Sequence, residues 1–391
     1  MSWLLVTKAW PWPVRRGLQA RTIEIAALLA ERGEATVLCP EPPSDWAVRA
    51  MPAELPYKVV TYRVRRAGRP IGLARAAIGG RSLQSGLYAG GELARRFHRL
   101  ADSVDRVLLQ TGRLSALSPL PERDRLVVDL IDSLSLNFER RARFDRALLK
   151  PIWLYEAFRL RRDERRLVEA SRSSFVVSER DRGHLEEVVG AELAPRLGVV
   201  PLAIAKFPEP GPERPGDDRF TLLTTGNLGY FPTRHGLDWF LEEVWPAVRT
   251  AVGGARLVVA GSRASSGLER RLRGAGGELV RDPPDLATLH LAADLALAPL
   301  FAGSGTPMKL LEAIGAGLPA LATPFAAAGL DPAIAAGIEV SGEAAGWIDA
   351  VRRAAAERDS WRARAAAARR AALAVHSPGA VSDRFWRTVD R

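Results

Sequence analysis

The sequence predicts an α/β fold made of two doubly wound domains, each with a parallel sheet. Short apolar and β-branched runs alternate with longer helical patterns along the whole chain. A stretch rich in proline and glycine, 207–218, interrupts this alternation once and indicates a linker. At 391 residues, the chain is long enough for two domains that each bury a core.

The first domain is predicted from seven short strands and a clear amphipathic helix. We expect strands at 3–7, 36–39, 59–63, 106–110, 126–130, 175–177 and 199–201. The segment 18–32 repeats apolar residues at helical spacing, and Gly33 ends it. Units of strand, helix and strand give parallel sheets with helices on both faces.

The alternation of strands and helices restarts after the linker. Strands are predicted at 220–225, 256–260, 278–280, 295–299, 319–323 and 338–340. Helices are predicted at 237–252, 266–273, 286–293, 307–316 and 344–374. Ligands of such sheets bind outside the carboxyl ends of the strands, so two facing domains would form a cleft.

The composition limits the classes of function. The net charge is +11, but only five residues are lysine and no nucleic-acid-binding motif is present, so we expect no nucleic-acid partner. The single cysteine, Cys39, excludes an internal disulfide and fits a reducing cytoplasm. No apolar run approaches the ~20 residues that span a bilayer, and the N-terminus lacks the pattern of a signal peptide.

The segment 301–323 is the most informative part of the chain. Thr306 is predicted to cap a helix that starts at Pro307 and is stopped by Gly317 and Pro319. The free N–H groups and the positive end of this helix would face residues 303–306, which favours a phosphate.

Glu312 lies in this otherwise apolar helix and leans toward its N-terminus. A carboxylate accepts two hydroxyl hydrogen bonds, so a ribose beside a diphosphate would fit. The alternative, a solvated surface glutamate, is disfavoured because the neighbouring residues leave almost no polar face.

Two glycine-rich loops after strands are further candidates. One leads to Gly17, with arginines nearby at positions 15, 16 and 21 (Arg15, Arg16 and Arg21). The loop 225–236, with Gly226 and Asn227, occupies the equivalent place in the second domain. Either loop could contact an anion or a sugar, and an ordinary βα loop is an equally good interpretation.

Several other sites are excluded by spacing. The segment 303–305 begins a dinucleotide fingerprint, but Met308 stands where its third glycine belongs. The P-loop and zinc-hydrolase motifs are absent, and the histidines are scattered, so we expect no metal site. Asp129 and Asp132 end a strand, where turn formation and helix capping are the favoured roles.

The 303–323 motif within two tandem doubly wound domains resembles the GT-B glycosyltransferases of family 4. Segments 126–132, 136–139, 155–156 and 175–181 are similar to sugar transferases of exopolysaccharide gene clusters. The resemblance implies an N-terminal acceptor-binding domain at 1–205 and a C-terminal donor-binding domain at 206–375. The residues expected on the acceptor side are Arg15, Arg16, Gly17 and Arg21, and Gly226 and Asn227 are expected to bind the donor. A C-terminal helix at 376–391 would return to the first domain.

The family resemblance implies retaining transfer of a sugar from a nucleoside-diphosphate donor. Glu312 would hold the ribose, and the family's first glutamate would fall at Ser304. Gly303, Ser304, Gly305 and Thr306 would surround the diphosphate, with the N–H groups of Gly305 and Thr306 as donors. The candidates for the cations beside the phosphates are Arg234, Arg263 and Lys309. Such cations would replace a metal, so no cofactor is expected.

The acceptor is a glycan or a lipid-linked sugar by the same resemblance. Segment 140–162 mixes basic and aromatic residues at helical spacing and could lie on an anionic membrane. A core helix with a solvated basic face is the favoured interpretation. We therefore expect a cytoplasmic enzyme, with peripheral contact to the inner face of the membrane as an alternative.

Two other functions compete with this one. The first is a non-catalytic GT-B subunit that binds a nucleotide or a partner, which Ser304 in place of a glutamate keeps open. The second is an NAD-dependent oxidoreductase, which the missing third glycine disfavours.

Overall fold

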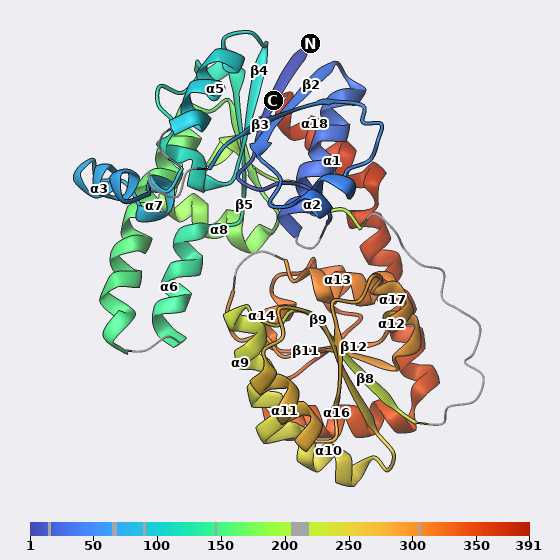
Figure 1. Cartoon of the computed structure of the whole chain (residues 1–391). Helices are drawn as coiled ribbons and strands as arrows, with labels where there is room; N and C mark the ends of the chain where they lie inside the picture. Colours follow the sequence, from blue (N-terminus) through green and yellow to red (C-terminus); the bar gives the residue numbers. More distant parts are fainter. Residues whose placement is uncertain (15–16, 65–68, 89–90, 145–146, 205–218, 304–305) are drawn as a thin grey trace. The chain divides into compact units, whose positions relative to one another are not determined.

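The computed structural model describes residues 1–14, 17–64, 69–88, 91–144, 147–204, 219–303 and 306–391. The predicted linker at 207–218 and four predicted site residues, Arg15, Arg16, Ser304 and Gly305, lie outside the described residues. The chain divides into two compact units (Figure 1). The first comprises Met1–Ala203 with Gly379–Arg391, and the second comprises Ile204–Pro378.

The first unit is built on a seven-stranded parallel sheet of order β3-β2-β1-β4-β5-β6-β7. Its strands are β1 (Ser2–Val6), β2 (Glu34–Pro40), β3 (Lys58–Tyr62), β4 (Arg106–Gln110), β5 (Leu126–Ile131), β6 (Ser173–Val176) and β7 (Leu197–Val199). Every predicted strand overlaps an observed one, but the strand predicted at 199–201 lies two residues earlier, as β7. Strands covered on both faces are continuous apolar runs that are easily recognised.

Helices cover both faces of this sheet. They are α1 (Gly17–Glu31), α2 (Asp45–Arg49) and α18 (Pro378–Val389) on one face, and α5 (Gly91–Ala101), α7 (Lys150–Ala170) and α8 (Glu179–Val189) on the other. The unit also contains α3 (Arg69–Ile78), α4 (Leu83–Gly86) and α6 (Leu134–Phe144). Alternate residues of β1 enter opposite cores: Leu5 packs with α1 and α18, and Leu4 packs with α5, α7 and α8.

The C-terminal helix α18 is an integral part of the first core. Phe385 packs edge to face on Phe175, with 5.8 Å between the ring centroids. Trp386 packs on Trp3 at 6.3 Å, and Arg32 lies over the Trp386 ring. The last thirteen residues therefore belong to the unit that the first strand begins.

Helix α7 provides buried carboxylates that cap two other helices. Both oxygens of Glu156 accept N–H groups at the start of α4, from Leu83 at 3.0 Å and Gln84 at 2.8 Å. Glu164 accepts the Ser135 N–H at 3.1 Å and the Ser135 hydroxyl at 2.6 Å, at the start of α6. Burial raises the pKa of Glu164 to about 7. These contacts use the orphan donors of helix N-termini and fix the acidic face of α7 inward.

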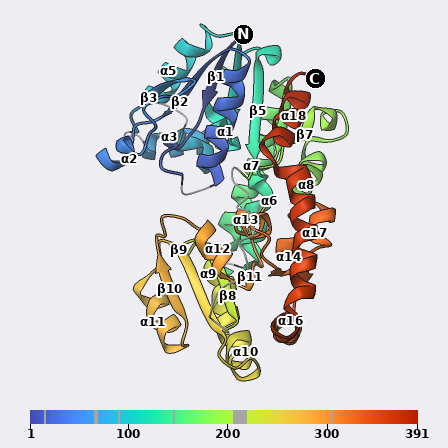
Figure 2. The ribbon, with the colours of Figure 1, turned by 90° about the vertical axis from the view of Figure 1, so that its right-hand side faces the viewer.

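The second unit has a six-stranded parallel sheet of order β10-β9-β8-β11-β12-β13, and Figure 2 shows its first strands side by side. The strands are β8 (Thr221–Asn227), β9 (Arg256–Ser262), β10 (Glu278–Arg281), β11 (Leu295–Ala298), β12 (Ala320–Ala322) and β13 (Glu339–Val340). All six predicted strands are present.

Two helix predictions in this unit were wrong. The helix predicted at 237–252 begins earlier, as α9 (Phe231–Trp239), and continues through a π-helical turn at Phe240–Val244 into α10 (Trp245–Ala251). The long helix predicted at 344–374 is two helices, α16 (Ala344–Ala356) and α17 (Arg358–His376), because Glu357 leaves the helical conformation with ψ at 44°. The other helices are α11 (Ser266–Gly274), α12 (Ala287–Ala292), α13 (Met308–Gly315), α14 (Pro324–Ala327) and α15 (Pro332–Ala335).

Gly236 sets how closely α9 approaches the sheet. A Cβ atom added at this position would lie 1.4 Å from the Pro299 carbonyl oxygen, just after β11. We predict that Gly236→Ala lowers the free energy of unfolding of the second unit by on the order of 3 kcal/mol, because backbone would have to move. Gly267→Ala in α11 is the matched control, since its nearest neighbour is a serine hydroxyl at 3.8 Å. Thermal melts should show a lower melting temperature for Gly236→Ala than for the parent, and a melting temperature at or above that of the parent for the control.

None of the helices in the described part of the chain combines the length and the apolar character needed to cross a bilayer.

Candidate functional site

The candidate site of the second unit lies at the point where the strand order of its sheet reverses, between β8 and β11. From β8 the chain proceeds to β9 and β10 on one side, and later to β11, β12 and β13 on the other. The loops that follow β8 and β11 therefore diverge, and ligands of doubly wound sheets bind in the crevice between such loops. Gly226 and Asn227 end β8, and residues 299–307 follow β11. The sequence thus brings two of its candidate segments to one place.

Glycines allow the backbone to pack tightly at this edge. Gly226 has a φ of 134° and Gly261, its partner across β8 and β9, has a φ of 151°. A Cβ atom on Gly261 would lie 1.8 Å from the Gly226 carbonyl oxygen. Only glycine accommodates this contact and this conformation together. Asn227 closes the following turn, since its side-chain oxygen accepts the Gly229 N–H at 3.1 Å.

Lys309 lies directly over this tight turn. A Cβ atom on Gly226 would be 3.3 Å from the Lys309 Nζ, so the ammonium group rests against the end of β8. Its Nζ donates to the Thr233 hydroxyl, on the first turns of α9, at 3.3 Å. The lysine side chain is partly buried and lies within the site.

Glu312 and Lys309 form a coupled pair one turn apart on α13. Burial raises the pKa of Glu312 to about 7, and the nearby Lys309 opposes this change. Burial lowers the pKa of Lys309 to about 8, and Glu312 opposes this change. Two ionisable groups whose pKa values are brought close to neutrality by burial are typical of ligand-binding sites.

Helix α13 begins and ends with defined backbone contacts. Thr306 was predicted as the cap and Pro307 as the first helical residue. Both predictions were wrong by one position, because Pro307 is the cap residue, with ψ at 99°, and the helix begins at Met308. The N–H groups of Met308 and Lys309 have no acceptor within the helix by its geometry. At the other end Gly317 has a φ of 73°, and Leu318 donates to the Ala313 carbonyl oxygen at 3.0 Å, as predicted for a helix stopped by glycine.

The remaining predicted residues of this unit differ in position. Gly303 has a φ of 124° and lies near the Pro232 ring of α9. Arg263, directly after β9, adopts a φ of 61°, and its side chain passes beside Gly229. Arg234 is exposed on α9, one residue beyond the threonine that binds Lys309. The structure therefore brings Lys309, Gly226 and Asn227 to one edge, with Glu312 one turn from Lys309 on α13 and Arg263 at the margin.

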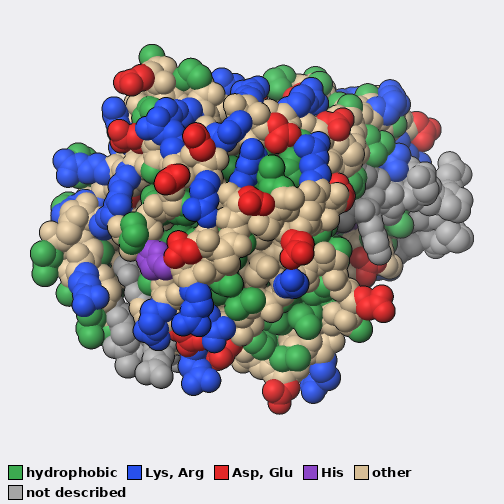
Figure 3. All heavy atoms as spheres, turned by 90° about the horizontal axis from the view of Figure 1, so that it is seen from above, with side chains coloured by type: hydrophobic (Ala, Val, Ile, Leu, Met, Phe, Trp, Pro, Cys, Tyr) green, Lys and Arg blue, Asp and Glu red, His purple; other side chains and the backbone are tan. Residues whose placement is uncertain are grey.

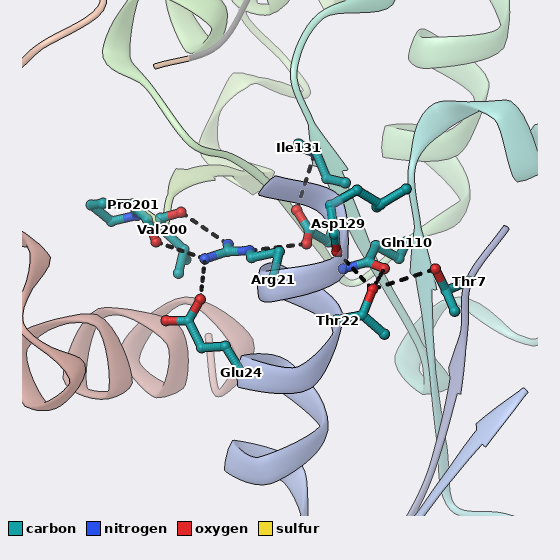
Figure 4. A network of polar contacts seen from close by, with 10 residues as sticks. Thr7, Arg21, Thr22, Glu24, Gln110, Asp129, Ile131, Val200 and Pro201 are labelled. Atoms are coloured by element: carbon teal, nitrogen blue, oxygen red, sulfur yellow. Dashed lines mark hydrogen bonds and ion pairs between the residues drawn. The ribbon is translucent and has the colours of Figure 1, made fainter. Parts of the chain in front are cut away.

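Arg21 was predicted on the acceptor side of the first unit, and the structure gives it a different role. Its side chain is fully buried and donates from Nε to Asp129 at 3.2 Å, from Nη1 to the Pro201 carbonyl at 2.6 Å, and from Nη2 to the Val200 carbonyl at 2.9 Å (Figure 4). Glu24 lies 3.7 Å away. These donors are occupied, so Arg21 fixes the segment after β7 to α1 and β5. Gly17 is the first residue of α1.

Thr233 is a site residue that sequence reasoning did not single out. It lies in the loop segment that was quoted for its glycines, and Pro232 beside it is a signal that could have placed it. Proline is favoured in the first turn of a helix, so a helix start at this point would bring Thr233 to the end of β8.

Comparison with known proteins gives a family match within the second unit. Residues 219–357 match the family model described as Glycosyl transferases group 1. The chain therefore carries a group 1 glycosyltransferase domain, and the prediction of a glycosyltransferase is confirmed for this part. No curated protein matches the chain.

The whole chain is similar in fold to solved glycosyltransferases. Anabaena Alr3699/HepE in complex with UDP-glucose is 13% identical, with a TM-score of 0.69 over 100% of this chain and 99% of that chain. WaaG, a glycosyltransferase involved in lipopolysaccharide biosynthesis, is 18% identical, with a TM-score of 0.67 over 98% and 99%. Sucrose-phosphate synthase from Thermosynechococcus elongatus is 13% identical, with a TM-score of 0.72 over 99% and 98%. The predicted fold class, two parallel-sheet α/β domains of the GT-B type, is confirmed.

Proposed function

We propose that this protein is a retaining glycosyltransferase of family 4 that moves a sugar from a nucleoside-diphosphate donor to a glycan or lipid-linked acceptor in surface or exopolysaccharide synthesis. The observation that carries the proposal is the group of Gly226, Thr233, Lys309 and Glu312 at the switch point of a group 1 glycosyltransferase domain. The UDP-glucose bound by HepE and the lipopolysaccharide role of WaaG support the donor and acceptor classes.

The chemistry requires charge stabilisation at the leaving group. As the glycosidic bond breaks, negative charge grows on the β-phosphate, and preorganised donors stabilise it. In this proposal the N–H groups at the start of α13, the positive end of the helix dipole and the Lys309 ammonium group are these donors. Arg263 supplies a second cation at the margin, so the reaction is proposed to proceed without a metal. Glu312 accepts the ribose hydroxyls.

The nucleotide affinity should depend on pH through the same pair. Below about pH 7 Glu312 is protonated and loses its capacity to accept two hydroxyls, and above about pH 8 Lys309 loses its charge. We predict maximal affinity for a nucleoside diphosphate between these values. Calorimetric titrations of the parent and of Glu312→Gln across this pH range test the prediction. The affinity of the parent should fall below about pH 7, and the affinity of the variant should not show this fall. Parallel curves for the two proteins would remove Glu312 from the binding step.

The experiment that tests the function uses the purified full chain. Thermal-shift measurements with UDP, GDP and NAD identify the nucleotide, since binding raises the midpoint by mass action. Hydrolysis of the corresponding nucleotide sugar, followed by release of the nucleoside diphosphate, then tests catalysis. Release of the diphosphate supports the proposal. Tight binding with no turnover on any donor would favour a non-catalytic nucleotide-binding subunit, and stabilisation by NAD alone would overturn both.

A further inference from the structure

Helix α7 exposes a row of large apolar side chains that the fold does not use. With α6 it forms a hairpin that extends away from the sheet of the first unit (Figure 1). Leu148, just before α7, is 90% exposed, and Ile152, Tyr155 and Phe158 are each about half exposed. Among the described residues, five of the fifteen exposed large apolar side chains lie between positions 148 and 158. Within α7, Ile152, Tyr155 and Phe158 are spaced three residues apart, which places these three side chains on one face of the helix.

Basic side chains continue this face. Arg159 lies over the Tyr155 ring with its Cζ 4.8 Å from the centroid, and Arg162 lies over the Phe158 ring at 4.4 Å. Arg165 follows one turn later and is exposed. We call Ile152, Tyr155, Phe158, Arg159, Arg162 and Arg165 the outer face of α7. An apolar end and a basic continuation on one face provide the apolar area and the positive charge on which binding to an anionic membrane surface depends.

The acidic residues of α7 do not compensate these charges. Glu156, Asp163 and Glu164 are buried, where they cap α4 and α6. Glu139 of α6 pairs with Arg161 beside the outer face, and Glu169 lies at the far end of the helix. In the described part of the hairpin the outer face therefore carries only positive charge. The face shown in Figure 3 is different, because acidic side chains are interspersed there among the basic ones.

We propose that the outer face of α7 docks the protein on an anionic lipid bilayer. A membrane surface offers the two features that this face requires, an apolar layer for Ile152, Tyr155 and Phe158 and negative head groups for the arginines. Arginine–aromatic pairs suit this boundary, since the rings enter the apolar layer while the guanidinium groups stay at head-group level. A solvated basic face, the interpretation favoured by the sequence, does not account for the exposed rings.

The apolar part of the proposal is tested by vesicle sedimentation of the full chain. Phosphatidylcholine vesicles with and without phosphatidylglycerol are mixed with the parent and with Ile152→Ser/Tyr155→Ser/Phe158→Ser. The parent should bind the anionic vesicles, and the triple variant should bind about tenfold or more weakly. The control Trp46→Ser/Val48→Ser/Val340→Ser removes three side chains of similar exposure elsewhere and should bind like the parent.

The charged part is tested by Arg159→Gln/Arg162→Gln/Arg165→Gln. Removal of three charges near an anionic surface should weaken binding by on the order of a hundredfold at low salt. The control Arg95→Gln/Arg99→Gln/Arg270→Gln changes the net charge equally at exposed sites outside α7 and should have a much smaller effect.

Three results would overturn the proposal. The first is that the parent stays in the supernatant, and the second is that the α7 variants and their controls lose vesicle binding equally. The third is that light scattering shows a dimer for the parent and a monomer for the apolar triple variant. The assay needs no nucleotide, so its failure is distinct from a failure of the proposed function. Only one consequence rests on the proposed function, namely that the protein meets a lipid-linked acceptor when it is docked on the membrane.

Discussion

Alanine in place of Glu312 should abolish sugar transfer while the protein stays folded. In the proposed complex the carboxylate accepts two ribose hydroxyls, and hydrogen bonds to a charged group contribute about 1.5–3 kcal/mol each. Their combined loss corresponds to more than a hundredfold in kcat/KM. The fold should tolerate the change because burial already disfavours the ionised carboxylate, which is why the pKa of Glu312 is raised to about 7.

The measurement is release of the nucleoside diphosphate from the donor by parent and variant, with circular dichroism melts run in parallel. Glu243→Ala is the matched control, since Glu243 is an exposed glutamate of the same unit, and it should turn over like the parent. Unchanged turnover in Glu312→Ala would remove the ribose role of this residue.

Methionine in place of Arg21 should cost about 3–5 kcal/mol of stability in the first unit. The substitution keeps an unbranched side chain in the site but leaves Asp129 as a buried carboxylate without its cation, and breaking a buried ion pair from one side typically costs this amount. Two carbonyl groups, of Val200 and Pro201, also lose their donors. Burial already raises the pKa of Asp129, and Arg21 is the main influence that opposes this.

The double variant Arg21→Met/Asp129→Leu distinguishes the cost of the unpaired carboxylate from the cost of the lost packing. If the uncompensated carboxylate is the main cost, the double variant recovers much of the stability lost in Arg21→Met. Differential scanning calorimetry measures the shift of the unfolding transition. A single variant as stable as the parent would show that Arg21 does not hold the segment after β7 in place.

The strands were predictable because parallel strands are covered on both faces. All thirteen predicted strands are present, since apolar and β-branched runs between glycine, proline and polar residues are their direct sequence signature. The start of α9 was not predictable in this way. Pro232 and Gly236 are typical loop residues, but Gly236 stands in this helix because a larger side chain would collide with the backbone just after β11.

The site was predictable in part for a similar reason. The Gly317 stop and the place of Glu312 on α13 are local features, readable from a few neighbouring residues. The burial of Arg21 depends on Asp129, which is 108 positions away, and on carbonyl groups 179 and 180 positions away. The approach of Lys309 to Thr233 spans 76 positions. Such contacts follow from the packing of the sheet and leave no mark in the local sequence.

The ribose role of Glu312 is tested most directly by a thermodynamic cycle between protein and ligand. Calorimetry gives the affinity of the parent and of Glu312→Ala for the preferred nucleoside diphosphate and for its 2′,3′-dideoxy analogue. We expect the parent to prefer the natural nucleotide by more than about tenfold, and the variant to bind both nucleotides alike, since the hydroxyls then have no carboxylate to contact. The same preference in parent and variant would contradict the account, because the hydroxyls would then be recognised elsewhere.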